Sequence, residues 1–70
     1  MAVQEKTEAT PLATQLHRIL MALARREADI AADEAAAVPY WAPMPASVTG
    51  HRTAADVLRS EAARLIGATS

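Results

Sequence analysis

Residues 38–45 (VPYWAPMP) contain three prolines within seven positions, and this segment limits what the chain can fold into. A proline lacks a backbone N–H, and it disfavours the helical conformation in the residue before it. No helix is expected to continue through this segment, whereas the Ala-rich stretches on either side have high helix propensity. The sequence therefore predicts an all-α fold, a two-helix hairpin with a long connector that carries proline and aromatic residues.

The first predicted helix covers residues 10–37. Thr10 can accept a hydrogen bond as the N-cap residue, and Pro11 suits the first helical position, where its missing N–H costs nothing. Pro39 disfavours helical geometry in the residue before it, which places the end of the helix near residue 37. Residues 1–9 show no apolar periodicity, and we expect them to form a flexible N-terminal tail.

The second predicted helix covers residues 53–66. Thr53 and Asp56 are three positions apart, which approximates a capping box at a helix start. Gly67 is typical of the residue that ends a helix in a left-handed conformation. These bounds leave residues 38–52 as the connector between the two helices.

The two helices and their connector form a single predicted domain over residues 10–67, followed by a frayed C-terminus over residues 68–70. The connector is expected to begin extended and to turn at Gly50. It is longer than the ~2–8 residues that usually join two helices, and long connectors are more often functional or disordered than merely connecting.

Large aliphatic side chains recur along the first helix at spacings of four, three, four and seven. They are Leu12, Leu16, Ile19, Leu23 and Ile30, with Leu20 beside them. On the second helix the corresponding residues are Val57, Leu58, Ala62, Leu65 and Ile66. The chain has eighteen Ala, Ala62 among them, and Ala buries little area. We therefore expect the stripe on the first helix to be buried against another chain, and two hairpins that pair in this way form a four-helix bundle.

The Ala-rich second half of the first helix, residues 28–37, is open to two interpretations. Small side chains permit close approach of a second helix, and in the first interpretation this half is a tight packing surface. In the second it is a solvated extension of a segment with high helix propensity.

The connector holds the only Tyr and the only Trp of the chain, and two roles are possible for them. They either cap the end of the hairpin core or dock on a partner, since large aromatic side chains often anchor interfaces. The predicted partner-binding residues are Leu16, Ile19, Leu20, Leu23, Tyr40, Trp41 and Met44.

We expect no catalytic residue, cofactor site or metal site, and we do not expect an enzyme. His17 and His51 lack the neighbours that a metal site or a general base requires. Asp29 and Asp33 share a helix face, but Arg25 lies four positions before Asp29, which is the spacing of ordinary surface ion pairs. The chain has no Cys and no Gly-rich phosphate loop.

The net charge of −1 and the pI near 6.0 give no overall attraction to nucleic acid or to an anionic membrane. The longest strongly apolar stretch falls short of a membrane span, and the polar N-terminus is not typical of a signal peptide. Six Arg against one Lys fit a GC-rich coding genome. We expect a bacterial, cytoplasmic protein without a membrane partner.

These observations favour a small non-enzymatic interaction, assembly or accessory subunit. It would dock on a protein partner, or on a second copy of itself as a homodimer, through its apolar stripe and its aromatic connector. The alternative is a small DNA-associated transcriptional regulator that uses Arg59 and Arg64 of the second helix. We weigh it lower, because a DNA-binding domain is expected to show a basic surface.

Overall fold

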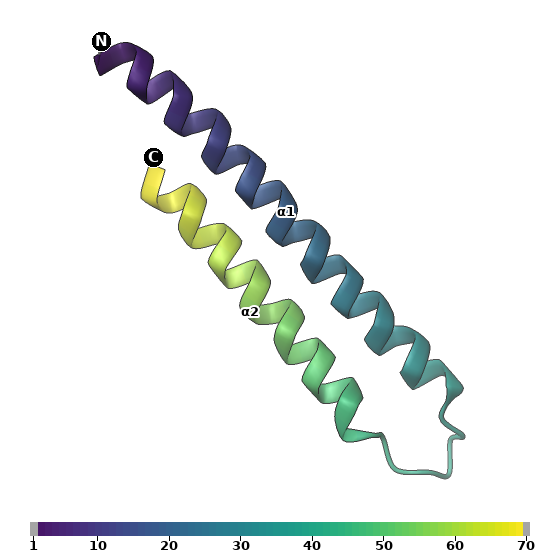
Figure 1. The fold of residues 1–70 in the computed structure, drawn as a ribbon. Coiled ribbons are helices and arrows are strands. Elements are labelled where there is room, and N and C mark those ends of the chain that lie inside the picture. The colour runs from purple at the N-terminus through teal and green to yellow at the C-terminus, as the bar shows by residue number, and fades with distance from the viewer. Residues whose placement is uncertain (1, 70) are drawn as a thin grey trace.

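The computed structural model describes the backbone of residues 2–69 and the side chains of residues 11–67. Helix α1 covers Ala2–Ala37 and helix α2 covers Ala46–Thr69. The two helices run antiparallel and side by side, and they form a rod of 62 × 15 × 12 Å (Figure 1). Residues 2–69 contain these two helices and no strand, which confirms the predicted all-α hairpin.

Helix α1 ends at Ala37, as predicted from Pro39, but it begins earlier than expected. The sequence placed its start at residue 10 after a flexible tail, whereas the structure continues the helix back to Ala2, with Pro11 inside it. Residues 4–9 (QEKTEA) are mostly strong helix formers, and they offset the single backbone hydrogen bond that Pro11 cannot donate.

Helix α2 begins at Ala46, directly after Pro45, and not at residue 53. The Val48 N–H donates to the carbonyl oxygen of Pro45 over 3.1 Å, and this bond forms the first turn. The Val48 side chain is fully buried. Burial of Val48 therefore anchors the helix start, and it outweighs the local capping signal that was expected seven residues later.

Three predicted boundary residues of the second helix lie inside α2. Thr53 is a helical residue, and Gly50 is part of the helix rather than a turn in the connector. Gly67 does not end the helix, which continues to Thr69, and no described glycine has a positive φ. The connector is accordingly residues 38–45, which is a usual length for a link between two helices.

The contact between the helices follows a heptad pattern on both of them. Every residue of this inner seam is buried or half-buried. On α1 and just beyond it, the inner seam consists of Ala13, His17, Leu20, Ala24, Glu27, Ala31, Glu34 and Val38. On α2 it consists of Val48, His51, Ala55, Leu58, Ala62 and Leu65. The spacings alternate between three and four residues, which is the pattern of antiparallel coiled-coil packing.

Alanine, not leucine, occupies the centre of this seam. Among residues 11–67, the buried residues are Ala13, Ala24, Ala31, Ala55 and Ala62, together with Val48. Small side chains at these positions let the two helices approach closely. The Ala-rich half of α1 therefore packs through one face, since Ala31 is buried, while Ala32 and Ala36 remain exposed.

Four residues of the large aliphatic stripe of α1 lie outside this core, whereas Ile30 is half-buried. These four residues, which we call the outer seam, are Leu12, Leu16, Ile19 and Leu23. Each of them immediately precedes a residue of the inner seam. One residue turns an α-helix by about 100°, so the two seams cannot both face α2. Turning α1 to bury the outer seam would bring Arg26 against α2, because Arg26 lies seven residues after Ile19. It would also remove Glu27 from the seam.

Candidate functional site

The tip of the hairpin is a β-turn. The N–H of Ala42 donates to the carbonyl oxygen of Pro39 over 3.0 Å, so Tyr40 and Trp41 occupy the two central positions of the turn. The N–H of Val38 donates to the carbonyl oxygen of Ala35 over 3.2 Å and closes the end of α1. Central turn residues project away from the chain on either side of them, and this explains why both aromatic side chains lie at the surface.

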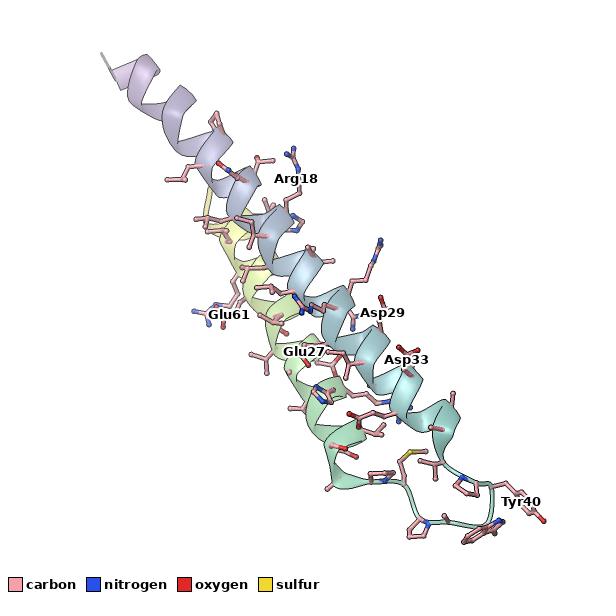
Figure 2. The ribbon with its side chains drawn as sticks, turned by 45° about the vertical axis from the view of Figure 1, so that its right-hand side comes forward. Arg18, Glu27, Asp29, Asp33, Tyr40 and Glu61 are labelled. Carbon is pink, nitrogen blue, oxygen red and sulfur yellow. The ribbon has the colours of Figure 1, made fainter. Side chains whose placement is uncertain are left out.

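Both aromatic side chains of the tip are open to solvent. Tyr40 is 100% exposed and Trp41 is 76% exposed, and Met44 next to them is half exposed. Figure 2 shows the side chain of Tyr40 pointing away from both helices at the end of the rod. In this structure Trp41 does not cap the hairpin core, so the first of its two expected roles is wrong for the single chain. No charged residue lies between residues 35 and 50, and the tip is therefore an apolar surface.

The outer seam forms a second apolar surface along the side of the rod. Leu16, Ile19 and Leu23 are each between 41% and 48% exposed, and Leu12 is more exposed than these three. Towards α2 the surface continues into a groove of about 410 Å³. Its walls are Leu16, Ile19, Leu20, Glu61, Arg64 and Leu65. Leu20 is half-buried because it belongs both to the inner seam and to the wall of this groove.

A groove of different character lies between the helices on another side of the rod. It has a volume of about 570 Å³ and is lined by Arg18, Met21, Ala22, Arg25, Ala28, Asp29 and Arg59. Arg18 and Arg25 share a face of α1 because they are seven residues apart, and Arg59 reaches the same groove from α2. Figure 2 shows Arg18 and Asp29 projecting outward from α1. The three guanidinium groups give this flank a positive charge that Asp29, and Asp56 paired with Arg59, offset only in part.

A polar cluster holds the two helices together near the tip. The Nδ1 atom of His51 lies 2.5 Å from Oε2 of Glu27, and its Nε2 atom lies 3.5 Å from Oε1 of Glu34. An ionised carboxylate only accepts hydrogen bonds, so the imidazole donates in the shorter of these contacts. The hydroxyl of Ser47 donates to Oε2 of Glu34 over 2.6 Å. The cluster fixes the relative register of α1 and α2, since each contact joins one helix to the other.

Several expected polar contacts differ in the structure. Asp29 forms no ion pair among residues 11–67, although the sequence suggested one with Arg25. The ion pairs on α2 are Arg59 with Asp56 over 3.4 Å and Arg64 with Glu61 over 3.3 Å, both exposed. Exposed pairs of this kind contribute little to stability.

The functional signal that the sequence analysis missed is the link between His51 and its two glutamates. Glu27 and Glu34 are seven residues apart on α1, so they share a helix face, and His51 lies opposite them in the antiparallel hairpin. A search for heptad positions shared by both helices would have found them. Among residues 11–67, no group of three or more His, Cys, Asp and Glu side chains is arranged to hold a metal ion.

No family model, curated protein or solved structure matches this chain. In the part of the chain that the structure describes, neither helix has an apolar stretch long enough to cross a lipid bilayer.

Proposed function

We propose that this protein is a small non-enzymatic interaction subunit that docks on other protein chains through the apolar tip and the outer seam. The observation that carries the proposal is that small side chains fill the core while large apolar side chains lie at the surface. The core of the hairpin is built mostly from Ala, while most of the large apolar side chains among residues 11–67 are exposed. A chain that leaves such side chains in water gains stability when a partner covers them.

The tip has the chemistry of an interface anchor. Trp and Tyr are enriched among the residues that contribute most to binding energy, and the stiff backbone beside proline lowers the entropy lost on ordering. Pro39 and Pro43 flank the turn on both sides. The tip therefore presents two large rings whose immobilisation costs little.

The test is a pull-down with the purified full chain as bait in an extract of the source cells, read by mass spectrometry. The wild-type chain and Trp41→Ala are compared, and circular dichroism confirms that both baits are equally helical. We expect proteins that the wild-type chain retains to be depleted at least tenfold with Trp41→Ala. Retention of the same proteins by both baits would contradict docking through the tip.

A second candidate function is binding of duplex DNA, and one observation favours it. Arg59 of α2 lines one groove together with Arg18 and Arg25 of α1, and guanidinium groups gathered on one surface are suited to contact a phosphate backbone. Arg64 lines the other groove, so the structure offers a matched control on the same helix.

The DNA candidate predicts duplex binding that weakens steeply as salt increases, since phosphate contacts release counterions. Arg59→Ala should weaken the binding and Arg64→Ala should not, measured by fluorescence anisotropy with a labelled duplex. No binding at about 50 mM salt would eliminate this candidate.

A further inference from the structure

We infer that the occupant of the outer seam and its groove is a second copy of this chain, in an antiparallel two-fold dimer that forms a four-helix bundle. This inference rests on the proposed function, since it names the partner of one of the two proposed docking surfaces. The tip is left free in such a dimer. Three properties of the outer seam and its surroundings support a second copy over an unrelated chain.

The first property is spacing. The outer seam Leu12, Leu16, Ile19 and Leu23 alternates spacings of four and three residues, which is the geometry that packs against another helix with the same repeat. The chain itself carries such a repeat. In an antiparallel pair centred between Leu16 and Ile19, Leu12 lies opposite Leu23 of the second copy, and Leu16 lies opposite Ile19. Every member of the outer seam then has an apolar counterpart.

The second property is the charge at the rim of the groove. A two-fold interface brings the same patch of both copies together, so the patch must be compatible with itself. The charged groups of this groove are Glu61 and Arg64, which carry opposite signs and already pair over 3.3 Å. A second copy therefore meets a groove rim without net charge. Arg26, which continues the outer seam beyond Leu23, falls opposite residue 9 of the second copy, at the end of the interface.

The third property is the contrast with the other groove. That groove is lined by Arg18, Arg25 and Arg59, with Asp29 as its one acidic residue. Arg59 is paired with Asp56 over 3.4 Å, so two copies that met through this groove would bring together the four guanidinium groups of Arg18 and Arg25, and like charges at an interface are unfavourable. Self-association is thus directed to the outer seam, and the arginine groove stays on the outside of the bundle.

The test measures the mass of the purified full chain by sedimentation equilibrium over about 1–500 μM. We expect the mass to rise from 7.4 kDa to twice that value and to stop there. Ile19→Glu should shift the midpoint of the transition at least tenfold to higher concentration. Met21→Glu is the matched control, since Met21 has a similar exposure but lines the arginine groove, and it should leave the dimer intact.

A cross-linking experiment keeps the test decisive if Ile19→Glu fails to fold. The chain contains no Cys, so a single introduced cysteine is the only site at which the cross-linker can react. A short bifunctional maleimide should link Leu16→Cys chains into dimers and leave Met21→Cys chains of equal concentration unlinked. Equal cross-linking of the two variants would overturn the inference.

Two further results would overturn the inference. One is a helical monomer across the whole concentration range, and the other is an assembly larger than a dimer. Both leave the docking function of the tip untouched, because loss of retained proteins with Trp41→Ala is measured separately. Conversely, a dimer that retains no other protein would support this inference and contradict docking through the tip.

Discussion

Replacing one buried alanine of the inner seam by leucine tests how closely the two helices pack. Ala62 is fully buried on α2, and its neighbour Ala63 is exposed, so Ala62→Leu and Ala63→Leu make the same change on two faces of one helix turn. Leu and Ala have similar helix propensities. The difference between the variants therefore reports the space between the helices.

Three added carbon atoms have no room at position 62, and overpacking of a tight core costs about 1–3 kcal/mol. A chain of this size has a total stability of about 3.5–10 kcal/mol, so the loss is a large fraction of it. At about 4–8 °C per kcal/mol, Ala62→Leu should lower Tm by about 4–24 °C. Ala63→Leu should change stability by less than about 0.5 kcal/mol.

The assay is thermal unfolding followed by circular dichroism, with all chains at one concentration because association shifts Tm. The refuting result is an Ala62→Leu chain that is as stable as, or more stable than, Ala63→Leu. A stabilised variant would mean that the helices are separated by the distance of a leucine seam, and that the alanine core of this structure is wrong.

Three further predictions concern the tip, the polar cluster and a helical glycine. Trp41→Ala should leave the helical signal unchanged, and the fluorescence maximum of Trp41 in the free wild-type chain should be water-like and shift to the blue when a partner binds. His51→Ala should lower the free energy of unfolding by about 0.5–1.5 kcal/mol, measured by thermal unfolding, because its half-buried contacts with Glu27 and Glu34 are lost. The control Arg52→Ala, at the exposed neighbouring residue, should leave the free energy of unfolding almost unchanged. Gly50→Ala should stabilise the chain by about 0.5–1 kcal/mol, since Gly50 is helical and nothing lies within 4 Å of an added Cβ; a destabilised variant would show that residue 50 is not helical.

Local sequence signals predicted the end of α1 correctly and the start of α2 incorrectly. Pro39 acts through covalent geometry, which no tertiary contact can change, so the helix end at Ala37 could be predicted. Thr53 and Asp56 resemble a cap, but a cap contributes only about 1 kcal/mol. Packing of Val48 between the helices extends α2 back to Ala46, and this contact depends on residues of α1 that the local sequence does not reveal.

The choice of core face could not be predicted from apolar size alone. Leu16 and Ile19 form a clear stripe, but the residues that immediately follow the stripe positions, among them Leu20 and Ala24, form an equally regular repeat. The polar contacts between His51 and Glu27 fit only the alanine face, so pairing across the two helices distinguishes the faces. The exposure of Tyr40 and Trp41 likewise follows from the turn that only the folded connector defines.

The position of the β-turn at the far end of a narrow rod has a consequence for valency. In the proposed antiparallel dimer, each turn lies about 20 residues from the centre, which is about 30 Å at 1.5 Å per residue. The two tips then face opposite directions about 60 Å apart. Such a dimer would bridge two target molecules at a fixed separation, and a target with two copies of the binding site at that spacing would be held about 10²–10⁴ times more tightly than a target with one.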